Sequence, residues 1–345
     1  MGQETALIVK THAFGDAMLT TPAVRELMKK SDCRWWALTG PAAAQVWQRF
    51  PGMDEVFTAP FPPSGLRGRL SLMTWSLGMR NRLHEVDRSW VFQMDRSTRR
   101  WVRFLTGGQI VSGGSHPLGS WEEARGFDPG IFAGESYARI AGVAPPEFIP
   151  EFTPGPDEVD WARNLLGNGT WVAVAPGGGT NQRDTVLQKR WPVEGYRIVL
   201  NLLRKRGMGV ILLGGTLDRP VCSALAKSVS RDQGRVIDLT GSTDWGRTAA
   251  VLKACGVFLG NDSGTAHAAL AAGAQSVVIF GPTDPACLYP EDSIIPVTSG
   301  ISCAPCYSNT VFPGCSRSGA ECMSAVSPED VWTGLERVIH ENHNT

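Results

Sequence analysis

One segment of the sequence combines a turn, a helix start and polar side chains suited to binding a phosphate. Residues 260–267 read GNDSGTAH, with an apolar run before them and an Ala-rich stretch after them, which predicts a strand, a tight turn and a helix. Ser263 is of a residue type favoured at the N-cap of a helix. The backbone N–H groups of Gly264 and Thr265 would then be unpaired at the positive end of the helix dipole, where phosphates bind.

A second glycine-rich turn indicates a pocket for a diphosphate. Residues 176–180 read PGGGT, and residues 189–192 read KRWP. Consecutive glycines let the backbone approach a ligand closely, and the ammonium group of Lys189 would neutralise a diphosphate leaving group without a metal ion. The alternative is that Lys189 and Arg190 are surface charges before a helix whose start is marked by Pro192.

Three polar residues near these turns have two interpretations each. His267 lies four residues after Ser263, but the nucleophile-elbow pattern is missing, so we interpret His267 as a ligand contact or a packed polar residue. Asp262, just before the helix start, is equally ambiguous. Asp218 follows a Gly-Gly pair after a predicted strand, where an acid would hydrogen-bond a ribose hydroxyl or cap the next helix.

Near the N-terminus, Asp16 is the candidate general base. The first predicted strand leads into THAFGD at residues 11–16, and a helix is expected from about Ala17. A carboxylate there would accept the proton of an acceptor hydroxyl as it attacks a sugar carbon. The alternatives are that Asp16 is simply the N-cap or a first-turn acid of the helix, and that His12 is the base. The Gly-x-Gly-x-x-Gly pattern is missing here, which argues against a nicotinamide dinucleotide site.

Half of the eight cysteines lie in one short segment: Cys303, Cys306, Cys315 and Cys322. Clustered thiols at this spacing suit a tetrahedral structural metal such as zinc, and the alternatives are disulfides or unligated thiols. The N-terminus lacks a secretory signal pattern, so we expect a cytoplasmic protein, in which disulfides are rare.

The charge of the chain is balanced overall and uneven locally. With 33 basic and 33 acidic residues, it is not expected to bind nucleic acid. Nine arginines but only three acidic residues lie between Arg67 and Arg103. They form either a solvated helix face or a contact with an anionic glycan or glycolipid acceptor or with the inner membrane, and the acceptor candidates are Arg96, Arg99 and Arg100. No apolar run is long enough to span a membrane, so such a contact would be peripheral.

Alternating strand and helix patterns predict an α/β fold of two doubly wound domains. The expected strands are Ala6–Lys10, Arg34–Thr39, Glu55–Ala59, Ser89–Met94 and Gln109–Ser112, then Trp171–Ala175, Gly209–Leu213, Val236–Leu239, Gly256–Leu259 and Ser276–Phe280. The proline-rich stretch Ala144–Pro156 indicates a linker. Because ligands of such domains bind at the carboxyl ends of the strands, we expect a cleft between the two.

These segments together resemble glycosyltransferase family 9, the inverting lipopolysaccharide heptosyltransferases of bacteria. The matching segments are Gly15-Asp16 with TTPA at 20–23, KRWP at 189–192, Gly214-Gly215, GNDSGTAH at 260–267, FGPTDP at 280–285 and the cysteines ending at Cys322-Met323. They span nearly the whole chain in the order expected of the family.

The resemblance implies the GT-B fold, in which two Rossmann-like domains face each other across a cleft. We expect an acceptor-binding domain over residues 1–150, a nucleotide-sugar-binding domain over 151–327 and a C-terminal helix, 328–345, that packs back toward the first domain. The implied reaction is metal-independent, inverting transfer from ADP-heptose to a lipopolysaccharide-core or related glycan. The expected catalytic residue is Asp16, and the expected donor contacts are Thr180, Lys189, Asp218, Asp262, Ser263, Gly264, Thr265 and His267.

Two other classes of function stay open. One is a GT-B nucleotide-sugar epimerase or phosphorylase, which a sugar transferred to an acceptor would exclude. The other is an inactive nucleotide-sugar-binding regulator, which bound metal without donor turnover would favour. Heptose is expected on the resemblance alone, because nothing in the sequence selects it over another sugar.

Overall fold

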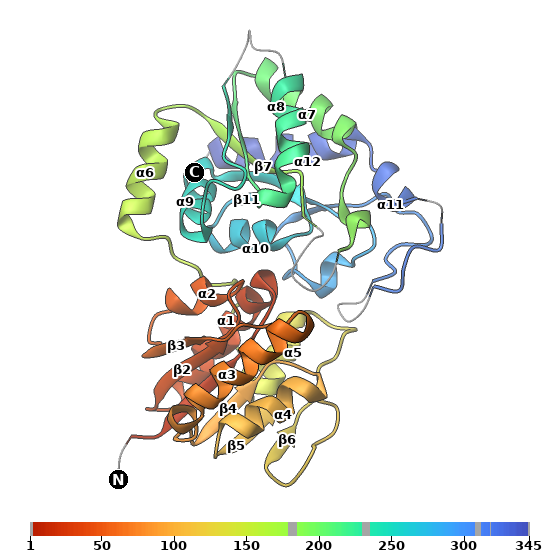
Figure 1. The fold of residues 1–345 in the computed structure, drawn as a ribbon. Helices are drawn as coiled ribbons and strands as arrows, with labels where there is room; N and C mark the ends of the chain where they lie inside the picture. The colour runs from red at the N-terminus through yellow and green to blue at the C-terminus, as the bar shows by residue number, and fades with distance from the viewer. Residues whose placement is uncertain (1–2, 179–184, 230–234, 308–311, 318, 344–345) are drawn as a thin grey trace. The chain divides into compact units, whose positions relative to one another are not determined.

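The computed structural model of the protein describes residues 3–178, 185–229, 235–307, 312–317 and 319–343. The chain divides into two compact units, Met1–Glu151 and Phe152–Thr345, called here the N-terminal and C-terminal domains. The division falls within the proline-rich stretch that the sequence indicates as a linker. Each domain is built around one sheet of six parallel strands (Figure 1).

The N-terminal sheet has the strand order β3-β2-β1-β4-β5-β6. Its strands are β1 (Thr5–Val9), β2 (Arg34–Thr39), β3 (Glu55–Thr58), β4 (Arg88–Val91), β5 (Gln109–Ser112) and β6 (Glu122–Ala124). Its helices are α1 (Phe14–Lys29), α2 (Ala44–Gln48), α3 (Gly65–Leu83), α4 (Arg96–Leu105) and α5 (Ala133–Ala141). Leu7 and Val9 of β1 share a core with Leu83 of α3 and Val102 of α4. Every residue of β1 is buried, as expected of a strand covered on both faces.

The C-terminal sheet has the order β12-β11-β10-β7-β8-β9, which is the same arrangement of first to sixth strand. Its strands are β7 (Trp171–Ala175), β8 (Gly209–Leu212), β9 (Val236–Asp238), β10 (Val257–Asn261), β11 (Gln275–Ile279) and β12 (Ile295–Val297). Its α-helices are α6 (Pro156–Leu166), α7 (Val193–Lys205), α8 (Arg219–Ser228), α9 (Trp245–Cys255), α10 (Gly264–Ala271), α11 (Glu321–Ser324) and α12 (Pro328–His343). Its short 3₁₀-helices are η1 (Leu187–Lys189), η2 (Thr216–Asp218) and η3 (Pro285–Cys287).

Side-chain caps fix the starts of two helices. The carboxylate of Asp95 accepts the N–H of Thr98 at 2.8 Å at the start of α4. That of Asp244 accepts the N–H of Arg247 at 2.9 Å at the start of α9. Each bond satisfies one of the backbone donors that a helix start leaves unpaired.

The last helix, α12, packs on its own domain. Val331, Leu335 and Val338 of this helix belong to the same buried core as Val277 of β11 and Val199 of α7. The expectation that residues 328–345 also reach the N-terminal domain stays a prediction.

The prediction of two doubly wound α/β domains is confirmed, and all ten expected strands are present. The sequence interpretation missed β6 and β12, the edge strands Glu122–Ala124 and Ile295–Val297. Helix α1 begins at Phe14, three residues before the expected Ala17, so Asp16 lies inside its first turn. In the part of the chain that the structure describes, no helix combines the length and the apolar character needed to cross a membrane.

Candidate active site

In the C-terminal domain, the two glycine-containing turns lie at the same edge of the sheet. Strands β7 and β10 are neighbours, and the strand order runs in opposite directions on either side of them. Residues 176–178 follow β7, and residues 262–263 follow β10. Ligands of doubly wound domains bind beside the carboxyl ends of the strands at such a switch point.

The start of α10 offers backbone donors, as the sequence predicts. Ser263 is the N-cap, and its carbonyl oxygen accepts the N–H groups of Ala266 at 3.1 Å and His267 at 3.3 Å. Within the described chain, the N–H groups of Gly264 and Thr265 have no such partner. As far as the described residues show, they are available to bind an anion at the positive end of the helix.

The hydroxyl of Ser263 does not cap α10, although the residue occupies the N-cap position. Its oxygen is buried and has no hydrogen bond among the described residues. Gly178 passes directly over this side chain: a Cβ at Gly178 would lie 2.9 Å from the Cβ of Ser263, and its φ is +97°. Only glycine fits a position that is this close and has this backbone conformation.

A lysine and an aspartate form a tight ion pair beside this helix start. Nζ of Lys189, at the end of η1, donates to Oδ2 of Asp262 at 2.6 Å. The Asp262 side chain is only 4% exposed, and the same oxygen accepts the hydroxyl of Thr283 at 2.9 Å. Burial alone would raise the pKa of Asp262, but the charges of Lys189 and His267 and the two hydrogen bonds lower it below its usual value. The carboxylate is therefore ionised and holds the lysine at the switch point.

His267 is a packed polar residue, which is one of its two predicted interpretations. Its ring is 5% exposed and stacks on the ring of Tyr289, with centroids 4.6 Å apart and planes 10° apart. Burial, and then the nearby Asp262, raise the pKa of Tyr289 well above its usual value. A direct contact of His267 with a ligand stays a prediction.

Asp218 connects the two glycine turns that follow β7 and β8. Its Oδ1 accepts the N–H of Gly178 at 3.2 Å and the guanidinium of Arg190 at 3.1 Å, and its Oδ2 accepts the N–H of Gly215 at 3.0 Å. It also occupies the N-cap position of α8, but its side chain makes no capping bond there. The predicted ribose contact of Asp218 stays a prediction, and Thr180 lies outside the described residues.

The sequence interpretation missed Asn261, which holds this site together. Its Oδ1 accepts the N–H of Trp191 at 3.1 Å and the hydroxyl of Tyr196 at 2.9 Å. Its Nδ2 donates to the carbonyl oxygens of Pro176 at 3.0 Å and Gly177 at 2.9 Å. The side chain is fully buried and ties the turn after β7, the segment that carries Lys189 and the end of β10 to one another. The sequence signal that could have indicated this role is the place of Asn261 within GNDSGTAH, the segment that predicts the phosphate site.

In the N-terminal domain, Asp16 also lies near a lysine at a switch point. Lys10 directly follows β1, and its Nζ is 4.0 Å from Oδ2 of Asp16. The lysine is buried, with Nζ donating to the hydroxyl of Tyr137 at 3.0 Å and to the carbonyl oxygen of Phe92 at 3.3 Å. Burial lowers the pKa of Lys10, and the charges of Asp16 and Asp95 oppose this shift in part.

The side chain of Asp16 is 45% exposed, so a hydroxyl can reach its carboxylate. Ala13 is the N-cap of α1, so Asp16 is a first-turn acid rather than the cap. The competing base, His12, lies 3.0 Å from the hydroxyl of Thr11 and 3.3 Å from the amide nitrogen of Gln93 through its Nδ1. Its ring also stacks on Phe61, with centroids 5.8 Å apart.

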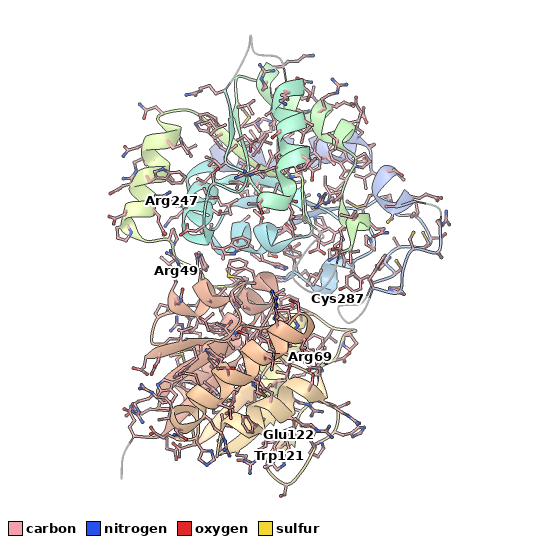
Figure 2. The ribbon with its side chains drawn as sticks, in the orientation of Figure 1. Arg49, Arg69, Trp121, Glu122, Arg247 and Cys287 are labelled. Atoms are coloured by element: carbon pink, nitrogen blue, oxygen red, sulfur yellow. The ribbon has the colours of Figure 1, made fainter. Side chains whose placement is uncertain are left out.

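The three candidate acceptor arginines of α4 separate into two groups. Arg96 and Arg100 are exposed. Arg99 is 3% exposed and donates to the buried carboxylate of Glu122 at 2.7 Å, so its expected surface contact with an acceptor is corrected to a structural ion pair (Figure 2 labels Glu122). Helical geometry explains the difference, because Thr98, Arg99 and Val102 lie on the side of α4 that faces the core.

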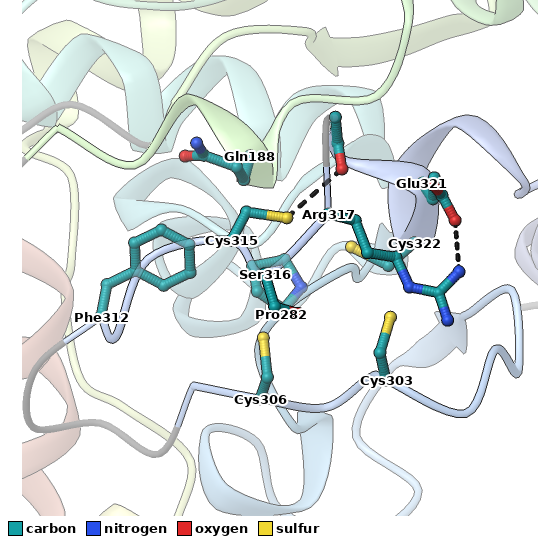
Figure 3. Close-up of a pocket in the computed structure, with 11 residues that line it drawn as sticks. Gln188, Pro282, Cys303, Cys306, Phe312, Cys315, Ser316, Arg317, Glu321 and Cys322 are labelled. Carbon is teal, nitrogen blue, oxygen red and sulfur yellow. Dashed lines mark hydrogen bonds and ion pairs between the residues drawn. The ribbon is translucent and has the colours of Figure 1, made fainter.

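The four late cysteines line one pocket (Figure 3). Cys303, Cys306, Cys315 and Cys322 are free thiols in the structure. Burial, followed by the neighbouring thiols, raises the pKa of Cys306 and Cys322. Four thiols around one hollow are a donor set that suits zinc or iron, but no group of three or more ligands in the described residues is close enough to hold an ion.

The cysteine pocket is tied to the candidate active site through the segment after β11. The backbone N–H groups of Cys306 and Tyr307 both donate to the carbonyl oxygen of Pro282 at 2.8 Å. Nζ of Lys189 lies 5.0 Å from the ring centroid of Tyr307. The segment that carries the cysteines thus also holds Tyr307, the ring on which Lys189 packs.

A sequence profile of glycosyltransferase family 9 (heptosyltransferase) matches residues 168–314, which contain both turns, Lys189 and the start of α10. The resemblance to family 9 is confirmed for this segment. Lipooligosaccharide heptosyltransferase 2 of Haemophilus influenzae is 27% identical over 122 residues, which are 35% of this chain and 34% of that protein. The sequence match thus spans about a third of the length of that relative.

Solved structures are similar in fold over nearly the whole chain. ADP-heptose lipopolysaccharide heptosyltransferase II of Escherichia coli has a TM-score of 0.76 at 17% identity, covering 99% of this chain and 100% of that one. The E. coli heptosyltransferase WaaC with ADP-2-deoxy-2-fluoro heptose has a TM-score of 0.68 at 18% identity, covering 98% and 99%. The GT-B fold class is thereby confirmed.

Proposed function

We propose that this chain is an inverting glycosyltransferase that transfers a sugar, with ADP-heptose as the favoured donor, to the lipopolysaccharide core or a related anionic glycan. The proposal rests on the N–H groups of Gly264 and Thr265, which have no backbone partner among the described residues, together with Lys189, which Asp262 holds near the same helix start. Both features attract the negative charge of a diphosphate. The solved WaaC relative, with its ADP-heptose analogue, supports ADP as the nucleotide.

On the acceptor side, we assign the general base to Asp16. The acceptor oxygen forms a bond to the anomeric carbon while the bond from that carbon to the diphosphate oxygen breaks. The acceptor proton passes to Asp16, and the bonding electron pair leaves with the diphosphate. One such displacement inverts the configuration at the anomeric carbon.

Lys189 and the start of α10 stabilise the negative charge on the departing diphosphate, so we propose that catalysis needs no metal ion. The exposed arginines Arg96 and Arg100 would bind anionic groups of the acceptor, with peripheral contact to the inner membrane.

The test of donor binding is titration calorimetry with ADP, UDP and GDP. ADP is expected to bind most tightly, and Lys189→Met is expected to weaken it by about tenfold or more, since a charge-assisted contact is worth about 1.5–3 kcal/mol. Lys253→Met, on the far end of α9, is the matched control and should leave the affinity unchanged. Equal affinity of Lys189→Met and the wild type for ADP would refute the assigned phosphate site.

The type of reaction is tested by analysing products from ADP-heptose and a lipopolysaccharide-core acceptor. A glycosyltransferase leaves the sugar on the acceptor and releases ADP. An isomerised donor would instead point to an epimerase. Donor binding without any turnover, together with bound zinc or iron by elemental analysis, would point to a regulator.

A further inference from the structure

Helix α3 presents an apolar stripe on its outer side. Leu66, Leu70, Met73 and Leu77 are 75%, 49%, 54% and 59% exposed. Their spacing of four, three and four residues puts them on one face of the helix. A second face, with Leu72, Met79 and Leu83, packs on the core of the N-terminal domain. The core therefore accounts for one apolar face of α3 and not for the other.

The charge on α3 has one sign. The 19 residues from Gly65 to Leu83 include Arg67, Arg69, Arg80 and Arg82 and no acidic residue. Arg82 is neutralised by Glu55 at 2.5 Å. Arg67 and Arg69 are exposed, and neither has an ion pair in the described part of the chain (Figure 2 labels Arg69). The outer side of α3 thus combines an apolar stripe with unneutralised positive charge.

The neighbouring helix α4 extends this surface. Arg80 donates to the carbonyl oxygen of Phe104 at 3.2 Å and lies over its ring at 4.9 Å. Phe104 is itself 42% exposed, and Arg100 of the same helix is exposed too. Figure 1 shows α3 and α4 side by side on the N-terminal domain.

We propose that the outer face of α3 is a membrane-docking face. It binds the surface of an anionic lipid bilayer, with Leu66, Leu70, Met73 and Leu77 inserted at the boundary of headgroups and acyl chains. Arg67 and Arg69 bind lipid phosphates beside them. Helices that lie in the membrane interface have this combination of an apolar face and basic flanks.

Charge complementarity selects a bilayer over a second copy of this chain. Two copies joined through α3 would bury the apolar stripe but bring Arg67 and Arg69 of each copy together, with no acidic residue on either helix. Like charges at an interface are destabilising. An anionic bilayer would bury the apolar side chains of the stripe and neutralise Arg67 and Arg69 at the same time.

This inference deepens the proposed function and rests on it for one point, that the acceptor glycan is carried by a lipid. A docked N-terminal domain would hold Asp16 near that acceptor. Vesicle binding can be measured without any turnover, so the two proposals fail separately.

The test is cosedimentation of the full chain with vesicles of phosphatidylcholine alone and of phosphatidylcholine mixed with phosphatidylglycerol. We expect binding to the mixed vesicles that weakens as salt is added. The double variant Leu70→Gln/Leu77→Gln should lower the partition coefficient by about tenfold or more. Arg67→Gln/Arg69→Gln should lower it by a similar factor on mixed vesicles and little on neutral ones.

Matched controls come from exposed residues elsewhere. Ile149→Gln/Ile198→Gln removes two exposed aliphatic side chains, and Arg163→Gln/Arg197→Gln removes two exposed charges, so both variants should bind vesicles like the wild type. Equal vesicle binding by the α3 variants and the wild type would overturn the proposal. So would self-association that Leu70→Gln/Leu77→Gln abolishes in a chain that does not bind vesicles. ADP titration of the same variants reports on the proposed function independently.

Discussion

The two domains carry the same pair of residue types at their switch points, but with the exposure reversed. In the N-terminal domain, the lysine is 5% exposed and the aspartate 45%, with Lys10 Nζ 4.0 Å from Asp16 Oδ2. In the C-terminal domain, the aspartate is 4% exposed and the lysine 16%, with Lys189 Nζ 2.6 Å from Asp262 Oδ2. The sheets have the same strand order: the N-terminal pair lies after the first strand, β1, and the C-terminal pair joins Lys189, after the first strand β7, to Asp262, after its neighbour β10.

Under the proposed function, this reversal would let one fold support two chemistries. A buried lysine that is also bound by Tyr137 leaves its aspartate partner open to solvent, where a carboxylate can take up a proton. A buried aspartate that is also bound by Thr283 anchors its lysine partner at a helix start, where positive charge can hold a phosphate. Which partner is buried therefore decides whether the site offers a base or a cation.

The largest expected effect is that of removing the exposed carboxylate. Asp16→Asn should lower turnover by about 100- to 10,000-fold, the usual contribution of a general base, because the amide cannot accept the acceptor proton. Steady-state kinetics with ADP-heptose and the acceptor measure this. Asp160→Asn, at an exposed position of α6, is the control. Near-normal turnover of Asp16→Asn would show that another group is the base.

The next effect concerns the residue that positions the C-terminal pair. Asn261→Ala should lower the free energy of unfolding by about 3 kcal/mol or more, because it leaves the N–H of Trp191 and the hydroxyl of Tyr196 buried without partners. Denaturant unfolding measures the change. The exposed Asn164→Ala on α6 should change stability by less than about 0.5 kcal/mol. A similar small change at Asn261 would mean that its four hydrogen bonds do not hold the site.

A pair of variants separates the structural from the binding role of Lys189. Lys189→Met should lower the free energy of unfolding by up to about 3 kcal/mol, because it leaves the buried carboxylate of Asp262 unpaired. Adding Asp262→Asn removes that charge and should restore most of the stability, but not the affinity for ADP. If the double variant regained ADP affinity, Lys189 would not contact the phosphate.

The smallest expected effect is the pH dependence of the stability that the Lys189–Asp262 pair contributes. The pKa of Asp262 is lower in the folded chain than its usual 3.8. Its ionised form therefore stabilises the fold above about that pH, and this stabilisation is lost as the pH falls through the folded pKa. The difference in unfolding free energy between the wild type and Asp262→Asn should be constant near neutral pH and shrink in acid. A difference that grows in acid would contradict a lowered pKa of Asp262 in the folded chain.

The sequence predicts the strands better than it predicts side-chain exposure. Ten strands and the start of α10 follow from apolar runs and glycine turns, because buried parallel strands leave continuous apolar segments. The edge strand Glu122–Ala124 was missed because its three residues contain two glutamates and no apolar run. One of those glutamates, Glu122, turns inward to pair with Arg99, so the same packing also hid the structural role of Arg99.

The candidate site shows the same limit. Lys189 and Asp262 are 73 residues apart in sequence, and nothing local indicates that they meet. The role of Asn261 is not evident from the sequence, because its partners lie far away in the chain, after β7 and just before and within α7. The exposed stripe on α3 is likewise indistinguishable from core residues by spacing alone, because both faces of that helix are apolar.

The most direct test of the reversed pairs is the affinity for ADP of Asp16→Asn and Lys189→Met, measured side by side by calorimetry. The account predicts that Lys189→Met loses affinity by about tenfold or more while Asp16→Asn binds like the wild type. Equal losses in the two variants, or a loss in Asp16→Asn alone, would contradict the assignment of the cation to one domain and the base to the other.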